Sequence, residues 1–176
     1  MKNRIWPVFL FLSVFAFLSC EKEQDVSVLQ GEWKSTEITF QLTPEDPEVR
    51  SAIAREINRL CDYFVVQFDE AHECREYRYK NGTQASMFTG SYFYNNGYKM
   101  RFRTSDFLGR TVVHLDLHTA DSMTGRFNVT RVFQDPSYLE QIGASDPKNH
   151  FIEKVEIMVS YRRTTSTDWE EKTPFP

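Results

Sequence analysis

Two histidines and an aspartate are spaced so that a β-strand would carry them on one face. They are His114, Asp116 and His118, and alternate residues of a strand point the same way. Imidazole and carboxylate groups in that arrangement could bind a divalent metal such as zinc. The apolar residues that alternate with them claim the core face, however, so the polar set should face solvent. We therefore interpret it as a solvated face, and we predict no cofactor.

The rest of the chain has no residue pattern that is typical of an enzyme. It contains no Gly-x-Ser-x-Gly, His-Glu-x-x-His, phosphate-binding loop or dinucleotide fingerprint. The acidic pairs Asp69-Glu70 and Glu170-Glu171 fall at a turn and near the C-terminus, where they give glycosidase chemistry no basis. We therefore predict a protein without catalytic activity.

Aromatic residues make up 15% of the chain and suggest a different kind of site. Alternation places Tyr92 and Phe102 on core faces, and Tyr77 and Tyr79 could line the same interior. Such rings can form the wall of a pocket for a small apolar or glycan-like ligand. They can also simply fill a small barrel, whose interior has room for little more than side chains. We therefore expect a barrel that binds such a ligand, and the alternative is a protein-protein interaction module of the outer membrane whose barrel is packed.

Residues 1–20 resemble the signal of bacterial lipoproteins. Basic Met1–Arg4 precedes an apolar run, Ile5–Leu18, which ends at Ser19-Cys20 and is followed at once by charged residues. In such signals the peptide is removed before the cysteine, which is acylated. The resemblance implies an exported lipoprotein that is held at the outer membrane through Cys20. The acidic segment 21–25 is similar to the surface-export signal of Bacteroidetes lipoproteins, which favours display on the outer face.

The domain organisation follows from this signal. We expect a signal peptide over 1–19, a lipidated tether over 20–26, a β-barrel domain over 27–164 and a flexible tail over 165–176. The mature chain of 157 residues is long enough to bury a core without a metal or a disulfide. It carries 19 basic and 25 acidic residues, and this net charge of −6 argues against nucleic acid as a partner.

Cys61 and Cys74 form an even pair once Cys20 is assigned to the lipid. An exported protein is permitted a disulfide, so the two could be bridged. Their spacing does not suit a tight hairpin, because Cys61 would have to reach across from a helix end. Two buried free thiols are the alternative.

Alternating apolar residues predict eight antiparallel strands, the first starting near Trp33. The clearest is Tyr98–Arg103, where apolar side chains share one face and three cations share the other. Turn signals such as Asn81-Gly82 separate the strands. An amphipathic helix is predicted from Thr43 to Leu60, with Thr43 as its cap and Pro44 at its first position. An up-and-down barrel removes exposed edges, and a two-sheet sandwich is the alternative.

The segment Leu29-Gln30-Gly31-Glu32-Trp33-Lys34 resembles the opening of lipocalin-like domains, in which Gly-x-Trp begins the first strand. The lipid anchor, the Asn-Gly turns and a last strand ending in Tyr-x-Arg resemble lipocalin-like lipoproteins of the Bacteroidetes. The resemblance implies a barrel closed at one end by Gly31, Trp33 and an arginine stacked on the indole. Arg163 is in phase with the last strand and is the better candidate, whereas Arg131 is its rival.

Overall fold

Eight antiparallel strands close into a barrel in which each strand pairs with its neighbours in sequence and the last pairs with the first. The structure is a computed structural model and describes residues 25–104 and 107–164. In chain order the strands are β1 (Gly31–Thr43), β2 (Tyr63–Phe68), β3 (Glu73–Lys80), β4 (Thr83–Tyr94), β5 (Tyr98–Phe102), β6 (Val112–Thr119), β7 (Ser122–Asn128) and β8 (Lys154–Thr164). This topology confirms the predicted up-and-down barrel, a lipocalin-like fold, over the sandwich.

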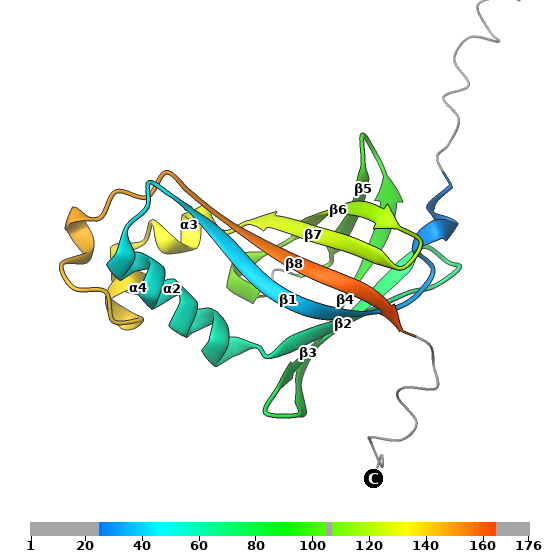
Figure 1. Cartoon of the computed structure of the whole chain (residues 1–176), viewed down its shortest axis with the longest axis horizontal. Coiled ribbons are helices and arrows are strands. Elements are labelled where there is room, and N and C mark those ends of the chain that lie inside the picture. The colour runs from blue at the N-terminus through cyan, green and yellow to red at the C-terminus, as the bar shows by residue number, and fades with distance from the viewer. Residues whose placement is uncertain (1–24, 105–106, 165–176) are drawn as a thin grey trace, which may run out of the picture.

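The pairing of β1 with β8 forms the seam that closes the barrel. It runs from the pair Glu32 and Thr164 to the pair Thr43 and Lys154, with one irregularity after Ser35. Figure 1 shows the two strands side by side along most of the length of the molecule. Because both edges of the sheet are used in this seam, no long unpaired edge is left open to other chains.

The two ends of the barrel differ in their helices. The 3₁₀ turn η1 (Val26–Leu29) lies where β1 begins, which we call the tryptophan end. The remaining helical segments lie at the opposite end, which we call the helical end (Figure 1). They are α2 (Pro47–Leu60), η2 (Phe107–Gly109), α3 (Thr130–Phe133), α4 (Pro136–Gln141) and η3 (Pro147–Asn149).

Helix α2 connects β1 to β2 as predicted, but it begins later than expected. Thr43 is the last residue of β1, and the helix cap is Asp46, whose carboxylate accepts hydrogen bonds from the amides of Glu48 and Val49. Pro44 follows Thr43 and Pro47 follows Asp46, and both preceding residues are able to cap a helix. Only Pro47 starts the helix. Pro44 is excluded because β1 stays paired with β8 as far as Thr43.

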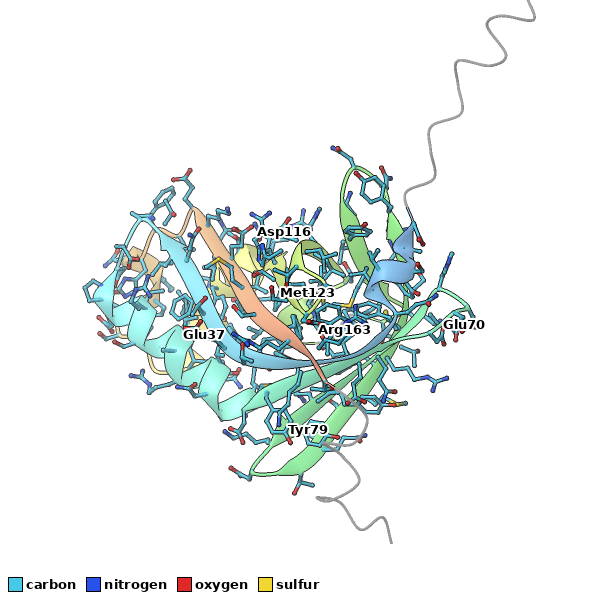
Figure 2. The ribbon with its side chains drawn as sticks, turned by 45° about the vertical axis from the view of Figure 1, so that its right-hand side comes forward. Glu37, Glu70, Tyr79, Asp116, Met123 and Arg163 are labelled. Atoms are coloured by element: carbon cyan, nitrogen blue, oxygen red, sulfur yellow. The ribbon has the colours of Figure 1, made fainter. Side chains whose placement is uncertain are left out.

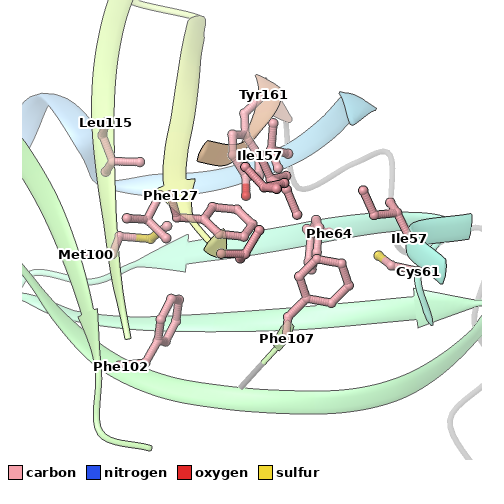
Figure 3. Close-up of a cluster of buried hydrophobic side chains, with 14 of the residues drawn as sticks. Ile57, Cys61, Phe64, Met100, Phe102, Phe107, Leu115, Phe127, Ile157 and Tyr161 are labelled. Atoms are coloured by element: carbon pink, nitrogen blue, oxygen red, sulfur yellow. The ribbon is translucent and has the colours of Figure 1, made fainter. Parts of the chain in front are cut away.

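Inward-facing side chains from all eight strands and from α2 form one buried cluster. Figure 3 shows its central part, where Phe64, Phe102, Phe107 and Phe127 face one another inside the barrel. The phenyl rings of Phe64 and Phe107 meet edge to face, with their centroids 5.3 Å apart. Such contacts add to the stabilisation that comes from burying the rings.

Trp33 closes the tryptophan end. Its side chain is fully buried, and its indole N–H donates to the Leu29 carbonyl at 2.8 Å. The Arg163 guanidinium lies over the ring, 4.3 Å from its centroid, and donates to the carbonyls of Val28, Gln30 and Ala120. The predicted stacking of Arg163 on Trp33 is therefore confirmed.

The rival assignment of Arg131 is wrong. Strand β7 ends at Asn128, and Arg131 is an exposed residue of α3 at the helical end. The alternation that predicted an inward-facing arginine stops with the strand.

Gly31 completes the closure because of its backbone conformation and its contact with Arg163. Its φ is +111°, a region that other residues rarely adopt. A Cβ atom on this residue would also lie 3.0 Å from Nη1 of Arg163. The Gly-x-Trp pattern at the start of β1 therefore has a steric reason as well as a conformational one.

Replacing Trp33 by Ala should lower the free energy of unfolding by about 3–5 kcal/mol, since it opens a cavity beneath Arg163. Urea titration followed by circular dichroism measures this change. The matched control is Tyr77→Ala on the outer wall, which should cost less than about 1 kcal/mol. Equal effects of the two changes would contradict the closing role of Trp33.

Candidate functional site

A fully buried ion pair between Glu76 and Arg110 lies inside the barrel. Both side chains are 0% exposed. The guanidinium donates two hydrogen bonds to the carboxylate, one from Nη1 to Oε2 at 3.2 Å and one from Nη2 to Oε1. Three phenyl rings surround the guanidinium, with centroids 4.6 Å (Phe102), 4.8 Å (Phe127) and 5.5 Å (Phe64) from Cζ.

The two charges reach the interior by different routes. Glu76 points inward from the middle of β3, in phase with Cys74. Arg110 comes from the connection between β5 and β6, where η2 turns back on itself. Leu108 and Gly109 both have positive φ values in this turn, and the Phe107 ring meets the Phe127 ring edge to face with centroids 6.2 Å apart. The connection thus places one ring and one cation inside the barrel.

The chemistry of this pair suits binding or structural support rather than proton transfer. Arginine stays protonated in proteins, so it does not act as an acid or a base. A buried pair of this kind gains little net stability, because removing two charges from water costs about as much as their attraction returns. Its other use is to fix the position of polar groups, either those of the chain itself or those of a bound molecule.

The four predicted ligand-binding residues divide between the two sides of the barrel wall. Tyr92 and Phe102 are buried inside, as expected. Tyr77 and Tyr79 lie on the outer wall, because Cys74 and Glu76 hold the inner positions of β3. Placing the two tyrosines in the interior was therefore wrong.

The error has a specific physical cause. Aromatic residues favour core faces, and in β3 this preference pointed to the tyrosines rather than to a cysteine and a glutamate. Pairing decides otherwise: Phe68 of β2 is an inner residue and lies opposite Cys74, so the inner face of β3 contains Cys74 and Glu76. The register across this hairpin was the signal that could have identified Glu76.

Cys61 and Cys74 are both free and buried, so the disulfide alternative is wrong. Cys61 caps the end of α2 just before β2, whereas Cys74 pairs with Phe68 at the other end of that strand. Phe68 follows Cys61 by seven residues of nearly extended chain, which span about 20 Å. Cys74 lies beside Phe68 and is therefore far beyond the reach of a disulfide with Cys61. Burial raises the pKa of both thiols to about 12.

The set formed by His114, Asp116 and His118 lies on the outer wall of β6, as the alternation predicted. Asp116 forms an ion pair with Arg126 at 2.7 Å, and Nε2 of His118 contacts the Thr124 hydroxyl at 2.9 Å. Within residues 25–104 and 107–164, no three His, Cys, Asp or Glu side chains come together in a way that could hold a metal ion.

At the helical end, polar contacts fasten α2 to the connection between β7 and β8. Tyr138 of α4 donates its hydroxyl to Glu56 at 2.8 Å, and Arg55 donates to the carbonyls of Ile142 and Gly143 at 3.3 Å each. Glu56 is buried, and its bidentate hydrogen bonds from Arg59 lower its pKa. These contacts hold two segments together that are far apart in the sequence.

His150 belongs to the same set of polar contacts and has an acceptor at each ring nitrogen. Nδ1 lies 2.7 Å from the Asp46 carboxylate, and Nε2 lies 2.8 Å from the Ser145 carbonyl. Both nitrogens can donate only when the ring is protonated. The Ser145 carbonyl raises the pKa of His150 most, and the carboxylates of Asp46 and Glu48 add to this shift.

Replacing Arg110 by Met should lower the free energy of unfolding by about 3–5 kcal/mol, because it leaves the Glu76 carboxylate buried without this partner. Adding Glu76→Leu to the same chain should recover at least half of that loss. The matched control is Arg126→Met in the exposed pair with Asp116, which should cost less than about 1 kcal/mol. A double variant no more stable than Arg110→Met would contradict this account of the pair.

The His150 contacts should make stability depend on pH. Because the pKa of His150 is raised in the folded state, its contribution is fully present below the unfolded value of about 6.5 and is lost as the pH rises through the folded value. His150→Gln should therefore destabilise by about 0.5–1 kcal/mol in acid and by less above neutrality. Urea titrations across that pH range measure the difference, and an equal loss of stability at every pH would contradict this role of His150.

No family model matches this chain, and no curated protein matches its sequence. Within the described residues, none of the helices has the length and apolar character needed to cross a membrane. Only the barrel fold of the chain is therefore lipocalin-like, and a fold of this kind can serve many functions.

Proposed function

We propose that this protein is a non-enzymatic lipoprotein of the bacterial cell envelope, and that its barrel binds another envelope protein. The anchor is supported by the signal-like residues 1–19 and by Cys20, which lie outside the described residues. An acylated Cys20 would hold the barrel close to the outer membrane, and the acidic residues after it favour the outer face. In that position the barrel would meet other components of the envelope surface.

The occupied interior of the barrel is the observation that favours a protein partner. The ion pair of Glu76 with Arg110 lies inside it, and rings from β2, β5 and β7 surround the guanidinium. These groups belong to the chain itself and make one buried cluster. A barrel built in this way offers its outer surface for recognition.

The outer wall of β2, β3 and β4 carries a tyrosine face made of Tyr63, Tyr77, Tyr79 and Met87. The register places Tyr63 opposite Tyr79 and Tyr77 opposite Met87, and the Tyr63 and Tyr79 rings stack with centroids 4.7 Å apart. Met87 is 49% exposed, and Figure 2 shows Tyr79 on the outside of the barrel. Tyrosine and methionine are enriched in the centres of protein interfaces.

A small apolar or glycan-like ligand inside the barrel is the second candidate. It is favoured by Arg78, the inner residue of β3 nearest the helical end, whose buried Nε makes no hydrogen bond within the described residues. Ser86, its partner on β4, likewise has a buried hydroxyl without a hydrogen bond there. Buried polar atoms of this kind usually have a partner, and a ligand would supply one.

The two candidates differ in what the protein carries when it is purified from its own host. Native mass spectrometry should show the acylated chain alone if the barrel recognises a protein. A bound molecule of constant mass that is lost in Arg78→Met would instead support the ligand. Thr124→Val on the outer wall is the control and should leave any bound molecule in place.

Photo-crosslinking in the host tests the proposed function directly. A photoreactive residue at position 87 should give a protein adduct, whereas one at His114 on the far wall should give none. Tyr79→Ser should abolish the adduct, because it removes the stacked ring beside the probe. Cys20→Ser should release the protein from the membrane fraction, since acylation supplies the anchor. Equal adducts at both positions, or none, would contradict the proposal.

A further inference from the structure

The N-terminal end of the described chain is fixed at the tryptophan end of the barrel. Asp25 caps η1, and its carboxylate accepts a hydrogen bond from the amide of Ser27 at 2.8 Å. Val26 and Leu29 are buried, and the carbonyl of Val28 accepts a hydrogen bond from Arg163 at 2.7 Å. The chain therefore enters the barrel at one defined place, next to Trp33.

Exposed apolar and aromatic groups surround that place. The hairpin of β4 and β5 rises beside η1 beyond the rim of the barrel (Figure 1). Its residue Tyr98 donates a hydrogen bond to the carbonyl of Asp25 at 3.4 Å, and the Tyr94 ring meets the Tyr98 ring edge to face at 5.2 Å. Tyr94 is 41% exposed and Val28 is 39% exposed. We call Val28, Tyr94 and Tyr98 the rim patch.

The length of the preceding chain limits how far this patch can lie from a lipid anchor. Four residues lie between Cys20 and Asp25, so five Cα–Cα steps join the two. A fully extended chain of that length spans at most about 18 Å. If Cys20 is acylated, as the proposed function requires, Asp25 lies within about 18 Å of the anchored cysteine, so the rim patch beside Asp25 stays near the membrane surface.

The chemistry of the rim patch suits that position. Tyrosine has an apolar ring and a polar hydroxyl, and it is enriched where membranes meet water. The segment between Cys20 and Asp25 carries Glu21 and Glu23 against Lys22, so it is not drawn to anionic lipid by its charge. Contact with the bilayer would therefore depend on the rings and on the short connection.

We propose that the tryptophan end of the barrel lies against the lipid bilayer, with the rim patch in the interfacial region. This inference rests on the proposed acylation of Cys20. It directs the helical end away from the membrane and leaves the tyrosine face on the side wall accessible to a partner in the same envelope.

Fluorescence quenching by brominated lipid tests the orientation. The acylated chain, purified from host membranes, is placed in phosphatidylcholine vesicles whose acyl chains carry bromine near the headgroups. Two variants are compared with the parent chain: Tyr94→Trp in the rim patch and Phe151→Trp in the connection between β7 and β8 at the helical end. Phe151 is 72% exposed, so its replacement should also be tolerated.

The tryptophan added at position 94 should lose about half of its intensity, whereas the one added at position 151 should keep its intensity. Added salt should not change this result, because the contact depends on the rings rather than on charge. Absence of quenching at position 94, or equal quenching at both positions, would overturn the orientation and assign the rim patch to a protein contact instead.

Flotation of the same samples separates this inference from the anchor on which it depends. The parent chain should float with the vesicles, and Cys20→Ser should not. If the parent chain fails to float, the proposed anchor is wrong and the orientation fails with it. If it floats while position 94 stays unquenched, only the orientation is wrong.

Discussion

The closure of β1 on β8 is the constraint on which the rest of the structure depends. Each of the other strand pairs joins neighbours in sequence, some through tight turns and others through helical connections, whereas this seam joins the two ends of the domain. Once it forms, the inward faces of all eight strands surround one volume, and their side chains must fill it. The seam also brings Arg163 to Trp33, since the two residues are direct partners across it.

The way this interior is filled shapes what the protein can do. Aliphatic and aromatic side chains make up the buried cluster, and the Glu76 and Arg110 pair lies among its phenyl rings. Buried charges need close partners of opposite charge, because burial costs them their hydration. Their position ties the β5–β6 connection to β3. The interior is therefore apolar, and it also contains a polar contact that fixes the position of the β5–β6 connection.

The barrel has two ends of different character, and this polarity links its architecture to its proposed role. At the tryptophan end, ring stacking and hydrogen bonds to carbonyls fix the N-terminal segment against the last strand. At the helical end, hydrogen bonds and ion pairs join α2 to the α4–η3 region, and one of them involves His150, whose pKa is raised by its contacts. An anchor near one end leaves the other end and the side walls free for recognition.

The sequence by itself determined the strands and the helix between β1 and β2, because local alternation is reliable where one face is plainly apolar, as in β5 and β8. It favoured a barrel over a sandwich, and its resemblance to lipocalin-like domains implied an arginine stacked on Trp33, with Arg163 ahead of Arg131. The pairing of β1 with β8 decided both questions. Only the tertiary structure decided which face of β3 points inward, because register across the hairpin with β2 overrode the preference of tyrosine for a core. It also separated Cys61 from Cys74, and it brought Arg110 from a loop to Glu76, a contact between distant residues that no local pattern encodes.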